Sequence, residues 1–118
     1  MAAASGSDFV RGNLDLMVLL VLAEDAAYGY RIQQQLRAAS RGLVDVPAGT
    51  LYPLLHRLEA DKLIRSRWDD SAGRRRKWYV LTATGRRRLQ CRARQWREVA
   101  DCLDRLLAPV LGGAVEPA

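Results

Sequence analysis

The first strong pattern of apolar positions is the run LDLMVLLVLA, from Leu14 to Ala23. Because nearly every position is apolar, the run predicts a helix over residues 13–24 that is buried on every side. It is far shorter than the roughly 20 apolar residues that span a bilayer. Asp15 also interrupts it, so we expect neither a membrane span nor a signal peptide. The small residues that precede it predict a disordered tail over residues 1–8.

Helical spacing continues in the next segment, YGYRIQQQLRAAS. Tyr28, Ile32 and Leu36 lie four residues apart and therefore share one face of a helix. Ser40 and Gly42 are residue types that commonly end a helix. The pattern predicts a second helix that begins near Tyr28 and ends at these two residues, followed by a short connector.

The stretch PAGTLYPLLHRLEADKLI, residues 47–64, predicts a third helix with two distinct faces. Its leucines follow the spacing i, i+3, i+4, i+7, which makes one buried stripe of Leu51, Leu54, Leu55 and Leu58. The opposite and flanking positions carry small or polar residues: Gly49, Thr50, Tyr52, Pro53, His56, Arg57 and Ala60. Carboxylates occur only at the far end, at Glu59 and Asp61. The N-terminal half is therefore the part that can approach an anionic partner.

Two alternating segments then predict a β-hairpin. In IRSRW, Ile64, Ser66 and Trp68 share one face, and two arginines occupy the other. KWYVL, residues 77–81, alternates in the same way, and DDSAG supplies turn residues between the two arms. The second arm begins with four consecutive cations, Arg74 to Lys77.

A long last helix is predicted over residues 82–108. Thr82 is a typical N-cap, Pro109 is expected to end the helix, and residues 109–118 are expected to form a tail. Leu89, Trp96 and Leu103 repeat every seven residues, and Val99 and Leu106 fill the alternate position. Such a seam needs a partner helix, so we expect a homodimer. The residues expected at its interface are Leu14, Leu89, Trp96, Val99, Leu103 and Leu106.

Three helices followed by a basic hairpin predict a mainly α fold with a small β-hairpin, the winged helix-turn-helix. The predicted winged helix-turn-helix domain covers residues 9–81, and the predicted dimerisation helix covers residues 82–108. A length of 118 residues suits one such small domain with one extra element.

The positive charge of the chain is concentrated in one region. The net charge is +6, and residues 65–97 hold twelve Lys or Arg but only two acids, Asp69 and Asp70. A local positive surface favours a nucleic-acid partner, and the alternative is an ordinary solvated helix surface. Both interpretations apply to Arg86, Arg87 and Arg88, which either lie near a phosphate or acidic neighbour or are simply solvated.

The expected DNA contacts combine the N-terminal half of the third helix with the basic arm of the hairpin. A helix fits the major groove of B-DNA and reads bases with its N-terminal residues, whereas a wing contacts phosphates or the minor groove. The predicted DNA-binding residues are Thr50, Tyr52, Pro53, His56, Arg57, Arg74, Arg75 and Lys77. Two alternatives stay open: Tyr52 is a half-buried ring near the wing, or His56 has no role.

The sequence shows no catalytic or metal-binding pattern. His56 is the only histidine, and Cys91 and Cys102 are the only cysteines, so neither a zinc site nor a disulfide framework is expected. There is no nucleophile–base pair and no phosphate-binding loop, so we expect neither an enzyme nor a cofactor. The two cysteines are either a redox switch or small packing residues.

Two motifs, GTLYPLLHRLEADKLI and GRRRKWYVLTATGRRRL, resemble the PadR family of bacterial transcriptional regulators. The resemblance extends from Phe9 to Leu107, and the single short C-terminal helix is similar to the compact subfamily, which includes multidrug-sensing repressors. It implies a homodimer joined by the last helix, a double-stranded DNA operator, usually repression, and in some members release by a small aromatic ligand. Pro47 and Ala48 replace the Ser-Pro that often precedes the third helix, which leaves Asp45 as the candidate N-cap.

The resemblance also implies a ligand site at the last helix. Trp96 lies where an aromatic residue lines a pore in the multidrug-sensing members, and a planar aromatic inducer would lie between two such rings. The other residues implied to line this site are Phe9, Asp15, Val99 and Ala100, with Asp15 attracting cations. The alternative is that Trp96 only fills the core of the dimer.

We therefore expect a dimeric, sequence-specific DNA-binding transcriptional regulator, a repressor released by a small aromatic ligand at the dimer interface. It is expected in the bacterial cytoplasm, associated with the nucleoid and without a membrane partner. Two alternatives stay open: a winged-helix module that binds only protein, and a repressor without a small-molecule ligand. A steep loss of duplex binding with rising salt distinguishes DNA binding from the first alternative.

Overall fold

The computed structural model describes residues 2–71 and 73–112, with side chains from residue 12 onward. It is mainly helical with a small antiparallel sheet, which confirms the predicted fold class. The elements are α1 (Ala2–Glu24), β1 (Ala27–Tyr28), α2 (Gly29–Ala39), α3 (Ala48–Ala60), β2 (Ile64–Asp69), β3 (Arg76–Leu81) and α4 (Ala83–Leu111). Of the predicted C-terminal tail, residues 113–118 lie outside the described residues.

Two helices are longer than their sequence patterns indicate. α1 begins at Ala2, so the prediction of a disordered tail over residues 1–8 is wrong from Ala2 onward. Alanines at positions 2–4 are strong helix formers, and a nucleated helix extends at little cost. α4 continues through Pro109 to Leu111, because a proline in that turn removes a single backbone hydrogen bond without stopping the helix.

The sheet has three antiparallel strands in the order β1–β3–β2. The hairpin of β2 and β3 agrees with the prediction, and its register pairs Trp68 with Lys77 and Ser66 with Tyr79. The sequence pattern does not predict β1, which pairs Ala27 with Tyr79 on the other side of β3. Two residues are too few to show alternation. The pairing of β1 places the start of α2 beside the hairpin.

The core gathers apolar side chains from α1, α2, α3, the sheet and the start of α4. The predicted leucine stripe of α3 is buried in full, and most of the apolar run in α1 is buried with it. Leu14 and Leu89 are each only 5% exposed within this core. Their predicted place at a dimer interface is therefore wrong, because their surface is already covered inside the chain.

α4 begins where the sequence predicts. Thr82 caps it, since its hydroxyl accepts a hydrogen bond from the amide of Gly85 at 2.9 Å. The amide of Thr82 donates to the carbonyl of Leu63 at 3.0 Å. Gly85 lies so close to the same carbonyl that an added Cβ would overlap it. These contacts anchor the start of α4 to the residue that precedes β2.

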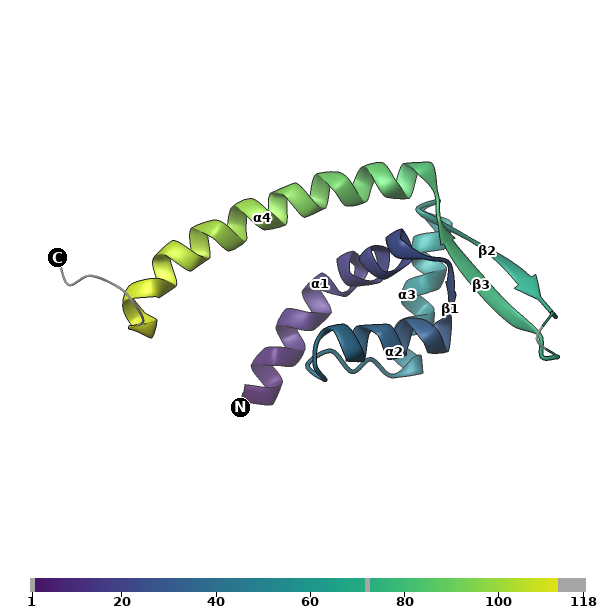
Figure 1. Cartoon of the computed structure of the whole chain (residues 1–118), viewed down its shortest axis with the longest axis horizontal. Coiled ribbons are helices and arrows are strands. Elements are labelled where there is room, and N and C mark those ends of the chain that lie inside the picture. The colour runs from purple at the N-terminus through teal and green to yellow at the C-terminus, as the bar shows by residue number, and fades with distance from the viewer. Residues whose placement is uncertain (1, 72, 113–118) are drawn as a thin grey trace.

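The molecule is elongated, with extents of 62 × 30 × 20 Å. Figure 1 shows α4 running away from the helical body toward one end of the molecule, while the β2–β3 hairpin projects at the other end. α3 lies between α2 and the hairpin. The fold therefore separates two regions, one made by α3 and the hairpin and one made by the projecting part of α4.

Candidate nucleic-acid interface

α3 presents a polar face to solvent, as the sequence predicts. The residues exposed on it are Thr50, Tyr52, Pro53, His56 and Arg57. Pro53 has no N–H to donate to the preceding turn, yet α3 continues through it to Ala60. The buried stripe holds the helix from behind, so these side chains lie at the surface, where a partner can reach them.

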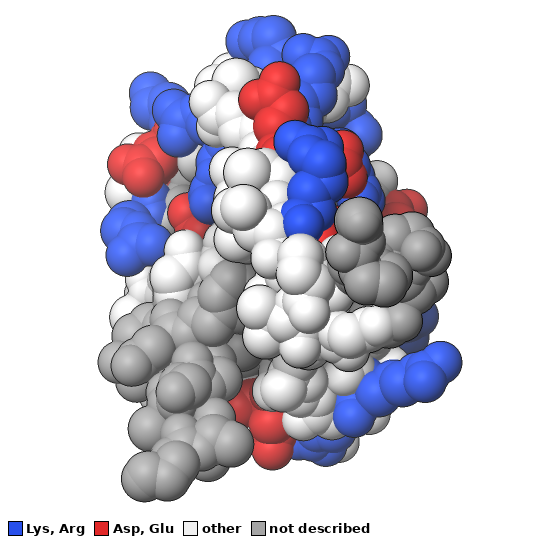
Figure 2. Space-filling model, turned by 90° about the vertical axis from the view of Figure 1, so that its left-hand side faces the viewer, with Lys and Arg blue, Asp and Glu red and all other residues white. Residues whose placement is uncertain are grey.

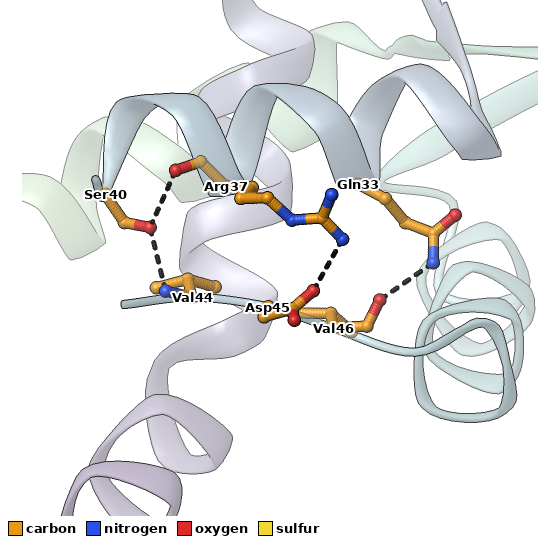
Figure 3. Close-up of polar contacts among 6 residues, drawn as sticks. All are labelled: Gln33, Arg37, Ser40, Val44, Asp45 and Val46. Carbon is orange, nitrogen blue, oxygen red and sulfur yellow. Dashed lines mark hydrogen bonds and ion pairs between the residues drawn. The ribbon is translucent and has the colours of Figure 1, made fainter. Parts of the chain in front are cut away.

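Side chains of α2 and of its C-cap residue, Ser40, hold the loop that leads into α3 (Figure 3). The Ser40 hydroxyl accepts a loop amide at 2.8 Å, and Gln33 Nε2 donates to the carbonyl of Val46 at 2.8 Å. The guanidinium of Arg37 pairs with the carboxylate of Asp45 at 2.8 Å. These contacts fix the direction in which the chain enters α3.

The prediction that Asp45 caps α3 is wrong. The N-cap is Pro47, which makes no side-chain hydrogen bond, and Asp45 pairs with Arg37 instead. The hydrogen bond and the negative charge of Asp45 raise the pKa of Arg37. Because Pro47 offers no side-chain acceptor, the first amides of α3 favour an external acceptor such as a phosphate.

One face of the hairpin is joined to α3 through Glu59. The Ser66 hydroxyl donates to the Glu59 carboxylate at 2.5 Å, and Lys77 Nζ lies 3.9 Å from the same carboxylate. Tyr79 lies buried on this face, and burial, followed by the charge of Glu59, raises the pKa of its phenol. The acid that would repel a phosphate is thus engaged by the hairpin. The charge of Lys77 is in turn partly balanced by this carboxylate.

A groove with a volume of about 780 Å³ lies between α3, the start of α2 and the hairpin. The residues that line it are Tyr28, Gly29, Tyr30, Tyr52, His56, Trp68, Arg74, Arg75, Arg76, Lys77 and Tyr79. It brings together five of the predicted DNA-binding residues: Tyr52, His56, Arg74, Arg75 and Lys77. Thr50, Pro53 and Arg57 lie on the exposed face of α3 outside the groove lining.

Tyr52 leans against the start of α2. A Cβ added at Gly29 would overlap the ring and hydroxyl of Tyr52, so the ring keeps its place only because residue 29 is a glycine. The Tyr52 side chain is nevertheless 37% exposed and lines the groove. Tyr52 is therefore a partly packed ring and also a candidate DNA contact, so the two interpretations drawn from the sequence are compatible.

Aromatic rings hold two of the hairpin cations. The guanidinium carbon of Arg75 lies 4.5 Å from the centroid of the Trp68 ring, and that of Arg76 lies 4.4 Å from the centroid of Tyr28. Both distances are within the roughly 6 Å range of cation–π attraction. Sequence reasoning assigned neither ring to this site. Alternation along β2 does put Trp68 on the side of Ser66, but the place of Tyr28 depends on β1.

The projecting part of α4 leaves an apolar stripe exposed. Its members are Trp96, Val99, Leu103, Leu106, Leu107, Val110 and Leu111. Figure 2 views the molecule from this end and shows uncharged side chains across the middle of the surface, with most charged side chains above them. A contiguous apolar stripe on an otherwise solvated helix is typical of an interaction surface.

Polar contacts join α4 to α1 beside this stripe. Arg92 Nη1 lies 2.6 Å from the Asp15 carboxylate, and both side chains are about one-third exposed. The indole N–H of Trp96 donates to the Asn13 side chain at 3.2 Å. Asp15 is thus already paired with a cation, which weakens its predicted attraction for a cationic ligand. Ala100 is half-buried and Val99 exposed, and the side chain of Phe9 lies outside the described residues.

The described residues contain no cluster of histidine, cysteine or carboxylate side chains that could hold a metal ion. Cys91 and Cys102 are both exposed free thiols. No helix in the described ranges is both long enough and apolar enough to cross a membrane.

The fold and the cationic groove define a winged helix-turn-helix protein of the DNA-binding class. Residues 18–91 match the transcriptional regulator PadR-like family, and the chain belongs to this family. Its members are transcriptional regulators rather than enzymes, and they bind DNA and typically act as dimers.

Individual relatives agree with this membership. The chain is 38% identical over 106 residues to the transcriptional regulator Rv3488 of Mycobacterium tuberculosis, and the match covers 90% of each chain. A crystal structure of a PadR-family transcriptional regulator from Eggerthella lenta is 36% identical, with a TM-score of 0.73 and coverage of 90% of this chain and 91% of that one. A transcriptional regulator from Clostridium thermocellum is 28% identical, with a TM-score of 0.76 and coverage of 84% and 94%.

Proposed function

We propose that the chain binds a double-stranded DNA operator, with the N-terminal half of α3 in the major groove and the hairpin against the adjacent backbone. The observation that carries this proposal is the groove, which places Tyr52 and His56 of α3 beside Arg74 and Arg75 of the hairpin. A helix reads base edges in the major groove, and neighbouring cations contact phosphates. The site of action is the nucleoid in the bacterial cytoplasm.

We further propose that two copies act together as a homodimer joined by α4. The support is the exposed stripe that includes Trp96, Leu103 and Leu106, which burial against a second α4 would remove from water. In a symmetric pair, two copies of α3 would meet DNA about one helical turn, or a multiple of it, apart.

The regulator acts as a repressor in this proposal, and a planar aromatic molecule held at the dimer interface releases it. The support for a ligand is Trp96, which is 40% exposed within the apolar stripe and offers a flat ring. Since Asp15 is paired with Arg92, the ligand would be held mainly by ring faces. The alternative, a repressor that needs no small molecule, leaves Trp96 as part of the dimer core.

DNA binding is tested in two steps. The purified protein first selects duplex fragments from its own genome, and the affinity for these labelled fragments is then measured by fluorescence anisotropy over a range of salt concentrations. The logarithm of affinity should fall linearly with the logarithm of salt, with a slope of about −0.9 per contacted phosphate. Arg75→Gln should reduce the magnitude of that slope by about one. Arg105→Gln removes an exposed cation of α4 and should leave it unchanged. Absence of duplex binding in dilute buffer would reject the proposal and favour the protein-binding module.

Ligand release is tested by titrating the protein with planar cationic dyes and recording tryptophan fluorescence and retained DNA. We expect quenching and loss of DNA in the wild type, and loss of both responses in Trp96→Ala. Dye responses that Trp96→Ala reproduces in full would favour the repressor without a ligand at this site.

A further inference from the structure

Trp68 stands on the wall of the groove rather than in the core. It is 55% exposed and lies near the far end of β2, opposite Lys77 in the register. Strand alternation puts it on the same face as Ser66, and that face is turned toward α3 because Ser66 donates to Glu59. Half in water beside α3, this ring contributes little to core packing, and its contacts with neighbouring cations are what suggest a function.

Two cations lie close to the Trp68 ring. The Arg75 guanidinium carbon lies 4.5 Å from the Trp68 centroid, and Lys77 Nζ lies 5.8 Å from it. Tryptophan is the aromatic side chain that attracts cations most strongly. A guanidinium that rests on a ring face keeps its N–H groups at the edge of the plane, where they remain available to phosphate oxygens.

We propose that Trp68 is a positioning residue for DNA binding, which holds Arg75 in the direction of the phosphates of a strand lying in the groove. The inference rests on the proposed DNA-binding function and adds a residue to it. An arginine otherwise loses much rotamer freedom when it binds. Ordering it beforehand on the ring lowers that loss, as preorganisation does in other interfaces.

A DNA strand is the occupant that the groove favours. The cations Arg74, Arg75 and Lys77 line it, whereas the one acid of α3 nearby, Glu59, is already engaged by Ser66 and Lys77. Several cations along a hairpin suit the repeating charge of a phosphate backbone. The rings then orient the cations and the cations meet the phosphates.

A double-mutant cycle tests the coupling of Trp68 and Arg75. Each protein is titrated against a labelled mixed-sequence duplex, because non-specific affinity depends mainly on phosphate contacts. Trp68→Leu should weaken binding about two- to fivefold, the range expected for an exposed cation–π contact. In the Arg75→Gln background, Trp68→Leu should have little further effect. Trp68→Phe retains a weaker ring face and should fall between the wild type and Trp68→Leu.

Arg67 supplies the matched control. It lies on the opposite face of the hairpin, paired with Trp78, so the effects of Arg67→Gln and Trp68→Leu should multiply. The positioning role is overturned if Trp68→Leu weakens binding equally in the wild-type and Arg75→Gln backgrounds. It is also overturned if the Trp68→Leu protein binds DNA as tightly as the wild type. In both cases the proposed DNA binding still stands. A wild type that binds no duplex would instead overturn the proposed function.

Discussion

At the scale of single residues, two glycines show how differently the same added methyl group would act. An added Cβ at Gly29 would meet the ring of Tyr52, which is the far end of a side chain and can move. At Gly85 it would meet the carbonyl of Leu63, which is backbone and also accepts the amide of Thr82. Gly29 therefore determines where the Tyr52 ring lies in the groove, and Gly85 allows the start of α4 to pack against Leu63.

Gly29→Ala should lower DNA affinity with little change in stability, because Tyr52 must leave its place while alanine improves the helix propensity of α2. Gly85→Ala should lower the free energy of unfolding by about 1–3 kcal/mol, the usual penalty of overpacking. Urea unfolding and duplex titration of both variants separate the two effects. A Gly29→Ala protein with full affinity would show that the position of Tyr52 does not matter for DNA binding.

At the scale of elements, a helix or strand can be predicted from the sequence when it has a single buried face. The leucine spacing of α3 and the alternation of β2 reflect one buried face each, so both are predictable from the sequence. β1 cannot be predicted from the sequence, because its two residues form a strand only by pairing with β3. The groove is predictable in part for the same reason. The exposed face of α3 follows from its pattern, whereas the contacts of Trp68 with Arg75 and of Glu59 with Ser66 depend on how elements meet.

The junction of α1 and α4 gives a prediction at this scale. Arg92→Gln should lower the free energy of unfolding by about 1 kcal/mol, because the partly buried carboxylate of Asp15 loses its cation. Arg97→Gln breaks a more exposed pair with Asp101, at 3.8 Å, and should change stability by less than about 0.5 kcal/mol. Urea unfolding measures both. Equal effects would show that the α1–α4 pair contributes no more than a surface ion pair.

At the scale of the whole molecule, the long axis separates the two surfaces on which the proposed function depends. The hairpin and the projecting part of α4 lie at opposite ends of the 62 Å molecule (Figure 1). A single copy carries the cationic groove at one end and an exposed apolar stripe at the other. Pairing of two stripes would cover that surface and link two grooves, so that binding of the first favours binding of the second through high effective concentration.

If the proposed dimer forms through α4, Leu103→Lys should convert it to a monomer at micromolar concentration, because the lysine places a charge in the centre of the stripe. Glu98→Lys changes the charge of α4 on a side away from the stripe and should remain dimeric. Sedimentation equilibrium gives the mass, and duplex titration of the same samples should show Leu103→Lys retaining only the weaker affinity of one groove. The folded core should be intact in both, since Leu103 is not part of it.

A Leu103→Lys protein that stays dimeric would place the contact between copies elsewhere. A monomeric wild type with full operator affinity would show that one groove suffices.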